Sequence, residues 1–166
     1  MSYDRHPSEK LNALFTKKPW QGADPMGAKY LFVGLDANYA PNIEHQVPEI
    51  WGYLNDGPNF WHTTGYHHPF RLPKYSGSGD LYHENFEKLG FLKNEAEQVS
   101  FIELLHVPTI GTSKLEVEDL CERHMLLLNN IFENGKYKWI FISSNVIGLM
   151  RKTHCCPVKN RIDSTG

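Results

Sequence analysis

Three short apolar runs, each ended abruptly by polar residues, constrain the fold of this chain more than any other feature. They cover residues 29–35, 99–105 and 138–142 and are rich in Leu, Ile, Val and Phe. Such runs are typical of β-strands, and a run without regular polar alternation is typical of a strand buried on both faces of a sheet. We therefore expect three strands, of which the first is buried on both faces.

Helical patterns separate these strands. Apolar side chains recur at helical spacing before Gly135, which stands where a C-terminal cap is expected. Ser8 and Asn145 precede shorter patterns as candidate N-caps, and Gly90 closes another. The predicted helices cover residues 8–17, 80–89, 117–132 and 146–152, with a loop at 20–27. This alternation indicates a three-layer α/β/α fold with a short, mostly parallel central sheet, and 166 residues suffice for one domain.

The segment 37–80 is too long for a simple connection between a strand and a helix, and it is rich in Pro, Gly, His and aromatic residues. We expect a long loop that contributes to the active site, because loops of this length in compact domains are commonly functional. The alternative is a satellite core built by the segment's own aromatic side chains. The candidates for that core are Trp51, Tyr53, Phe60 and Trp61.

Polar side chains follow each predicted strand and mark the expected site, because ligands of open parallel sheets bind at the carboxyl ends of the strands. They are Asp36 and Asn38 after the first strand, His106 and Thr109 after the second, and Ser144 and Asn145 after the third. Carboxylate, amide and hydroxyl groups beside aromatic residues suit a planar heterocycle. Asp36 is the candidate catalytic residue, although a carboxylate at this place also suits an Asx turn.

Several of these segments, in this order, resemble motifs of the uracil-DNA glycosylase superfamily, and in particular of its mismatch-specific uracil/thymine branch. The matching stretches are Leu31-Phe-Val-Gly-Leu-Asp-Ala-Asn38, Pro58-Asn-Phe-Trp61, Phe101-Ile-Glu-Leu-Leu-His-Val-Pro-Thr109 and the strand and helix over 138–152. The family's C-terminal His-Pro-Ser-like or Asn-Pro-Ser-like motif has no counterpart after Lys152. This difference indicates either a natural chain that continues past Gly166 or a divergent member of the family.

The resemblance implies hydrolysis of the N-glycosidic bond of uracil, or of a mismatched or damaged pyrimidine, after the base flips out of DNA into a pocket. Asp36 matches the position that handles the catalytic water, and His106 lies beside the position that recognises the base. The other expected substrate-binding residues are Asn38, Tyr39, Phe60, Ser144 and Asn145. The candidates for stacking on the base are Tyr39, Trp51, Tyr53 and Phe60. The alternatives are a non-catalytic protein that binds nucleobases or nucleic acid, and a hydrolase of free nucleosides.

Charge is distributed unevenly along the chain, although the net charge is only −2. Residues 136–162 contain six basic residues and no acidic residue. This pattern suits contact with a DNA phosphate backbone, or simply a solvated surface. The expected DNA-binding residues are Lys136, Arg151, Lys152, Lys159 and Arg161.

The remaining features lead us to expect no cofactor, metal or membrane partner. The histidines and the Cys155-Cys156 pair lack the spacing of zinc ligands, and no apolar run approaches the roughly 18 residues of a membrane span. The N-terminus is polar, unlike a signal peptide. His124, on the apolar face of the longest helix, is expected to be a hydrogen-bonded core residue. We expect a cytoplasmic monomer that binds DNA.

Overall fold

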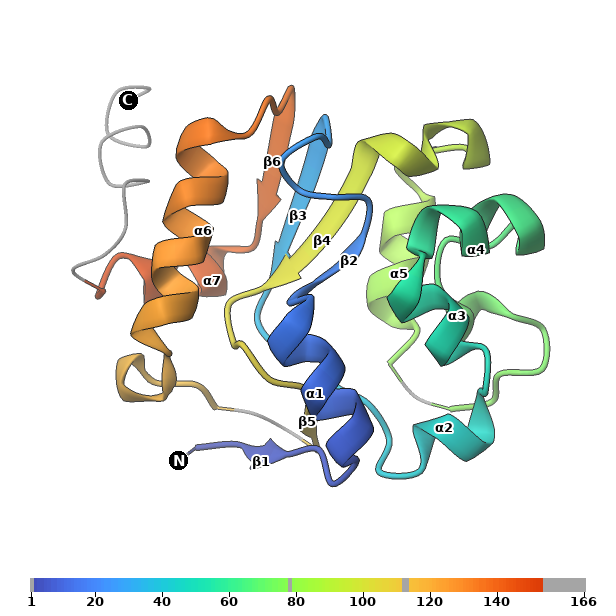
Figure 1. Ribbon diagram of the computed structural model, residues 1–166, viewed down its shortest axis with the longest axis horizontal. Helices are drawn as coiled ribbons and strands as arrows, with labels where there is room; N and C mark the ends of the chain where they lie inside the picture. The colour runs from blue at the N-terminus through green and yellow to red at the C-terminus, as the bar shows by residue number, and fades with distance from the viewer. Residues whose placement is uncertain (1, 78, 112–113, 154–166) are drawn as a thin grey trace.

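The computed structural model describes residues 2–77, 79–111 and 114–153, which form a mixed α/β structure (Figure 1). Four strands form the main sheet in the order β2-β4-β3-β6. They are β2 (Trp20–Gly22), β3 (Tyr30–Gly34), β4 (Val99–Glu103) and β6 (Trp139–Ile142). β3 pairs in parallel with β4 and β6, whereas β2 and β4 are antiparallel. The three predicted strands are confirmed, and β2 makes the sheet mixed.

The prediction of a loop at residues 20–27 is wrong for its first part, which forms β2. A strand of three residues is too short to show a periodic pattern in the sequence. At its end Gly22 has a φ of +75°, and a Cβ atom there would lie 2.7 Å from the carbonyl oxygen of Val99. Glycine is therefore required where β2 leaves β4.

Helices occupy much of the rest of the chain, and none within the described ranges is long and apolar enough to cross a membrane. The α-helices are α1 (Glu9–Lys17), α2 (Ile43–Gln46), α3 (Ile50–Asn55), α4 (Gly57–Thr64), α5 (Leu81–Glu87), α6 (Glu122–Asn134) and α7 (Ser144–Met150). The N–H of Leu11 donates to the Ser8 hydroxyl at 3.3 Å, which confirms the cap of α1. Gly135 is the C-cap residue of α6, as predicted.

Three expectations about helices need correction. The segment 37–80 is not an irregular loop, because it contains α2, α3, α4 and the 3₁₀ helix η1 (Pro69–Arg71). The long helix α6 begins only at Glu122, after the 3₁₀ helix η3 (Val117–Asp119). Ser143, and not Asn145, caps α7, because its hydroxyl accepts the N–H of Val146.

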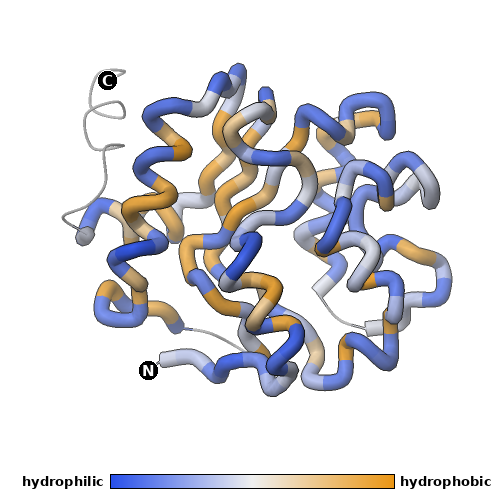
Figure 2. Tube along the Cα trace, viewed as in Figure 1, coloured by the Kyte–Doolittle hydropathy of each residue, from blue (hydrophilic) through white to orange (hydrophobic). Residues whose placement is uncertain are grey.

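Helices cover both faces of the sheet, and the hydrophobic residues gather along the strands and on the inner sides of the helices (Figures 1 and 2). On one face, aliphatic side chains of the strands pack against α6 and α7. The buried residues at the strands of this face are Leu31 and Val33 of β3, Ile102 of β4, and Leu104, which follows β4. On the other face, Phe32 and Phe101 pack with Trp61 of α4, Phe86 of α5 and Ala96 of the 3₁₀ helix η2 (Lys93–Gln98).

A further core joins α1 to the segment after β3. Leu11 and Phe15 of α1 pack there with Tyr39, Tyr53 and Phe60. The alternative of a satellite core is therefore confirmed for Tyr53 and Phe60. A small antiparallel pair formed by β1 (Asp4–Arg5) and β5 (Thr109–Ile110) ties the N-terminal segment to the chain after β4.

Candidate active site

A pocket of about 1140 Å³ opens at the carboxyl ends of β3, β4 and β6. Its lining comes from the end of β3 and the residues that follow it, from the ends of β4 and β6, and from side chains between positions 68 and 83. The connection from β3 to β4 packs on one face of the sheet, and α6, which connects β4 to β6, packs on the other. The pocket therefore lies where the strand order reverses, the usual ligand site of an open α/β sheet.

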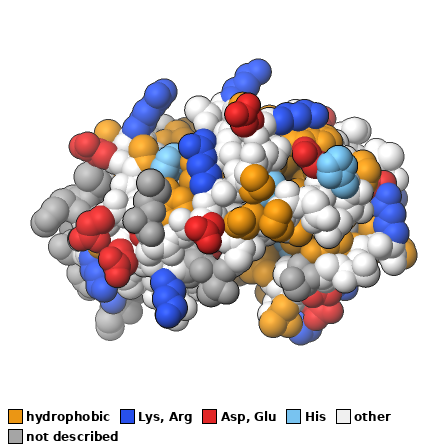
Figure 3. Space-filling view, turned by 90° about the horizontal axis from the view of Figure 1, so that it is seen from below, with side chains coloured by type: hydrophobic (Ala, Val, Ile, Leu, Met, Phe, Trp, Pro, Cys, Tyr) orange, Lys and Arg blue, Asp and Glu red, His pale blue; other side chains and the backbone are white. Residues whose placement is uncertain are grey.

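The face of the molecule at this end carries charges of both signs. Viewed from below Figure 1, basic and acidic side chains are interspersed, and hydrophobic side chains gather near the centre (Figure 3). Among the described residues in this view, no continuous basic surface of the kind that favours a DNA backbone is visible.

Strand register places a row of aromatic rings along the inner end of the pocket. Phe32 of β3 is paired with Phe101 of β4 and with Phe141 of β6. The ring centroid of Phe32 is 5.2 Å from that of Phe101 and 4.4 Å from that of Phe141. Two residues further on, where side chains return to the same face, Gly34 is paired with Glu103. The aromatic row is thus followed by a carboxyl group.

The carboxyl group of Glu103 lies against Gly34. A Cβ atom added to Gly34 would lie 1.9 Å from Glu103 Oε2, so the lack of a side chain at this position makes room for the carboxyl group. Burial, and next the Asp36 carboxylate, raise the pKa of Glu103 to about 8. The side chain therefore carries a proton at neutral pH, unlike an exposed glutamate.

Asp36 lies just beyond β3 and lines the same pocket. The Thr109 hydroxyl donates a hydrogen bond to its Oδ2 at 2.5 Å. Asn38 Nδ2 donates to the same hydroxyl oxygen at 3.1 Å and also to the carbonyl of Gly111. The N–H of Tyr39 donates to the Thr109 carbonyl at 3.0 Å. Thr109 therefore orients the polar residues that follow β3, and the segment after β4 supports the site.

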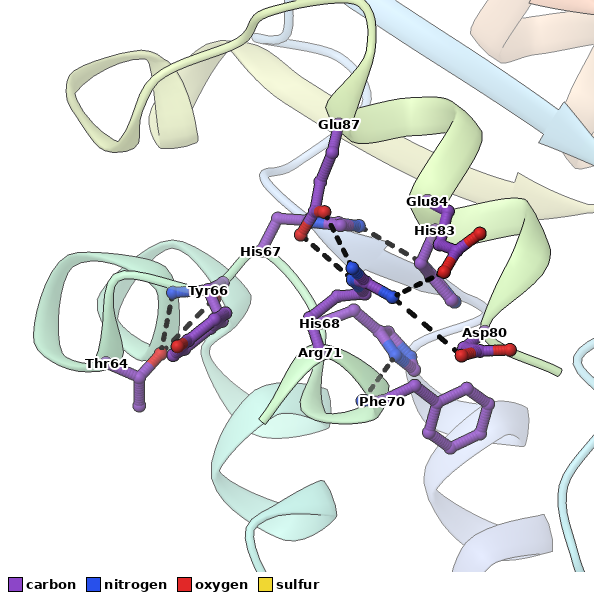
Figure 4. Close-up of polar contacts among 10 residues, drawn as sticks. All are labelled: Thr64, Tyr66, His67, His68, Phe70, Arg71, Asp80, His83, Glu84 and Glu87. Atoms are coloured by element: carbon purple, nitrogen blue, oxygen red, sulfur yellow. Dashed lines mark hydrogen bonds and ion pairs between the residues drawn. The ribbon is translucent and has the colours of Figure 1, made fainter. Parts of the chain in front are cut away.

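Histidines from two segments form another wall of the pocket (Figure 4). The rings of His68 and His83 are stacked at 3.6 Å with an interplanar angle of 9°. His67 Nε2 lies 3.1 Å from His83 Nδ1, within hydrogen-bonding distance. The N–H of Phe70 donates to His68 Nδ1 at 3.1 Å. These contacts join the residues before η1 to α5.

Burial keeps this histidine cluster, defined as His67, His68 and His83, uncharged at neutral pH. Desolvation, with a smaller effect of Arg71, lowers the pKa of His67 to about 3. Desolvation and the neighbouring histidines lower the pKa of His68 well below its usual value, and the same holds for His83. Of this cluster, His68 and His83 line the pocket, and they therefore offer neutral rings to it.

Arg71 links η1 to α5 beside the histidine cluster (Figure 4). Its Nη2 lies 3.0 Å from Glu87 Oε2, and its Nη1 lies 3.5 Å from Glu84 Oε1 and 3.9 Å from Asp80 Oδ2. Because these acids belong to α5 and to the residue before it, the ion pairs hold α5 against the pocket.

The structure brings only part of the predicted site together. Asp36, Asn38 and Tyr39 line the pocket. The Tyr39 ring is buried, and burial raises the pKa of its phenol, which therefore stays neutral. Phe60 belongs instead to the core around Tyr53, with ring centroids 5.6 Å apart. It faces α3, because the segment around it is helical and packs on α3.

His106 lies on the other side of the sheet from the pocket. Ile102 and Leu104 belong to the core formed with α6, and His106 continues this alternation. Its ring centroid is 6.2 Å from that of His124 on α6. His124 is buried and its Nε2 bonds the carbonyl of Glu103 at 2.8 Å, which confirms it as a core histidine.

The third strand end also differs from the prediction. Ser143 lines the pocket, whereas Ser144 and Asn145 are exposed in the first turn of α7. The reason is that Ser143 follows β6 directly and caps the helix, so the next two residues already turn away with α7.

Of the predicted DNA-binding residues that the structure describes, none lines the pocket. Lys136 precedes β6, at the end of the strand opposite the pocket. Arg151 and Lys152 follow α7 and are exposed. Lys159 and Arg161 lie outside the described residues.

Sequence reasoning missed Glu103, Ser143 and the histidine cluster. For Glu103 a signal was present, because it stands two residues after Phe101 and so shares a face with it. For the histidines no signal was present, since His83 is brought to His68 only by the folding of the chain between them.

No protein-family model matches this chain, and no curated protein and no solved structure matches it. In the part of the chain that the structure describes, no group of three or more His, Cys, Asp or Glu side chains could hold a metal ion.

Proposed function

We propose that this chain is a member of the uracil-DNA glycosylase superfamily that hydrolyses the N-glycosidic bond of uracil, or of a mismatched or damaged pyrimidine, in DNA. The observation that carries the proposal is the Asp36 carboxylate, which lies two residues after the central strand β3 and lines a pocket that aromatic rings also line. The motifs quoted from the sequence support it. So does the pocket volume of about 1140 Å³, which has room for a base together with its sugar.

In the proposed reaction Asp36 orients and deprotonates a water molecule that attacks C1′ of the sugar. The bond between C1′ and the base nitrogen breaks, and the base leaves with the electron pair. The carboxylate also stabilises the positive charge that develops on the sugar. The hydrogen bond that the Thr109 hydroxyl donates to Oδ2 fixes the plane of the carboxylate.

The test is base release from matched oligonucleotides that contain one uracil opposite guanine, opposite adenine or in a single strand. Asp36→Asn should lower turnover at least about 10²-fold while the protein stays folded, because an acid–base group is lost. Asp56→Asn is the matched control, since Asp56 is exposed, does not line the pocket and caps α4, a role that asparagine also fills. Equal turnover of wild type and Asp36→Asn would contradict the assignment.

Hydrolysis of free nucleosides is the second candidate, and a specific observation favours it. The face at the pocket carries both signs of charge (Figure 3). Lys136 precedes β6 and so lies at the end of that strand opposite the pocket. Free deoxyuridine and a uracil-containing oligonucleotide should therefore be compared at rising salt. Turnover of DNA that falls steeply with salt supports the glycosylase, whereas faster, salt-independent turnover of deoxyuridine supports the nucleoside hydrolase. Binding of uracil by the folded protein, without turnover of either substrate, would support the remaining alternative, a non-catalytic protein that binds nucleobases.

A further inference from the structure

Glu103 is a pocket residue for which the proposed reaction has no use. Its backbone is paired with Gly34, and its carboxyl group occupies the space over that glycine. Within the described part of the chain, no hydrogen bond or ion pair engages the carboxyl group. A polar group that is held in a pocket in this way, beside aromatic rings, is placed to meet a ligand.

We propose that Glu103 selects the bound heterocycle by pairing its carboxyl group with an adjacent C=O and N–H of the ring, as in the imide edge of uracil. The inference rests on the proposed function, because the ring would be that of the base to be released. Glu103 is then a specificity residue and Asp36 remains the residue that acts on water.

The protonation state of Glu103 supplies the chemistry. A protonated carboxyl group offers one O–H donor and one carbonyl acceptor side by side, whereas a carboxylate offers acceptors only. Its O–H would donate to a ring carbonyl while its C=O accepts the neighbouring ring N–H. Because the pKa of Glu103 is raised to about 8, this form is present at neutral pH.

Other titratable groups around the pocket do not replace Glu103 in this role. They are Asp36 and Tyr39 after β3, Tyr53 of α3, His68 before η1, Tyr75 after η1, and Tyr82 and His83 of α5. Burial raises the pKa of each of these tyrosines, with a smaller effect of Glu103 on Tyr39, Tyr53 and Tyr82 and of Asp80 on Tyr75, so the phenols stay neutral. Burial lowers the pKa of His68 and of His83 well below the usual value, so they too are neutral. Asp36 contributes the negative charge that favours a proton on Glu103.

The experiment measures binding of free uracil and of N3-methyluracil to the intact chain by calorimetry across about pH 6 to pH 9. Wild type should bind uracil, should discriminate against N3-methyluracil, which lacks the ring N–H, and should lose affinity about tenfold per unit above about pH 8. Glu103→Gln keeps a hydrogen-bond donor beside an acceptor, but its amide does not titrate. This variant should therefore bind uracil without the loss of affinity that wild type shows above about pH 8. Glu103→Leu should bind uracil at least about tenfold more weakly at pH 6, because two hydrogen bonds are lost. Glu97→Gln, at an exposed acid of η2, is the matched control and should follow wild type.

Three results would overturn the inference: no uracil binding by folded wild type, equal affinity of Glu103→Leu and wild type, or the same pH profile in wild type and Glu103→Gln. If Glu103→Leu fails to fold, the comparison between wild type and Glu103→Gln still decides. Binding of the free base requires no bond cleavage. Uracil binding that depends on Glu103 would therefore support this inference even if the protein releases no base from oligonucleotides, a result that would contradict the proposed function. Turnover that depends on Asp36 but not on Glu103 leaves the proposed function intact and refutes this inference.

Discussion

The two faces of the main sheet differ in chemistry although the same strands build both. The face covered by α6 and α7 is aliphatic and closed, with Leu31 and Ile102 packed on Leu128. The opposite face is aromatic, and beyond the strand ends it continues into the pocket with Asp36 and Glu103. Since successive side chains of a strand point to opposite faces, one short strand can serve both the core and the site.

The face covered by α6 and α7 stabilises the fold, whereas the face that leads to the pocket is less stabilising because it carries the polar groups of the site. On the face of α6 and α7, close packing of aliphatic side chains removes apolar area from water, and the buried His124 there is satisfied by a hydrogen bond to the carbonyl of Glu103. The other face buries the histidine cluster and a protonated Glu103, whose charged forms are disfavoured there. We therefore expect the two faces to respond to different perturbations.

The largest effect is expected on the aliphatic face. Leu128→Ala should lower the free energy of unfolding by about 3 kcal/mol, because a fully buried side chain is lost and a cavity remains. Leu126→Ala on the same helix is the control: Leu126 is 54% exposed, and the change should stay within about 0.5 kcal/mol. Urea denaturation followed by circular dichroism measures both. Uracil binding by the folded Leu128→Ala protein should be unchanged, and its loss would show that the faces are not separable.

Glu103 should make stability fall as the pH rises. The native state holds the proton up to its pKa of about 8, whereas the unfolded state releases it near 4.5, so the native state binds more protons between these values. Wild type should lose roughly 2 kcal/mol of unfolding free energy between about pH 6 and pH 8 from this group. Glu103→Gln should remove that loss in denaturation curves at the two pH values. Parallel pH profiles of the two proteins would contradict the buried, protonated state.

The histidine cluster should act in the opposite direction. The pKa of His67 is about 3 in the native state against 6.5 unfolded, so the unfolded state binds more protons between these values and stability falls as the pH falls. Between about pH 6.5 and pH 5 this histidine should lower the unfolding free energy by roughly 1.5 kcal/mol. His67→Gln should flatten this slope in thermal denaturation. His62→Gln, at a histidine whose side chain is 43% exposed, is the control, and an equal flattening there would refute the role of burial.

The smallest effect concerns the ion pairs that hold α5 at the pocket. Arg71→Gln should lower the unfolding free energy by about 1 kcal/mol or less, because the partners are partly exposed. High salt should reduce the difference from wild type. Lys88→Gln, at the residue that follows α5, is the control, since Lys88 Nζ donates a hydrogen bond to the side-chain oxygen of the exposed Asn85. A difference that salt leaves unchanged would mean that Arg71 acts through packing.

Local patterns in the sequence determined the three strands, the Ser8 cap and the position of Asp36 directly after β3. These features depend on near neighbours in the chain: a run of apolar β-formers, a side-chain oxygen three residues before a free N–H, and a polar stop after a strand. The helices between residues 37 and 80 were not predicted, because they depend on packing against distant segments and not on near neighbours in the chain. The four-residue helix α2 is too short to be stable by itself, so packing in the core of α1 and α3 has to stabilise it.

Tertiary structure alone decided which residues share the pocket. The pairing of Gly34 with Glu103 sets the carboxyl group beside Asp36, and the fold of α5 brings His83 to His68. The tertiary structure also places His106 on the side of the sheet away from the pocket. In the sequence, His106 follows a strand in the same way as Asp36 does. The sequence alone determined where each strand ends, whereas strand register and helix packing, which depend on contacts between distant segments, decided which side chains meet there.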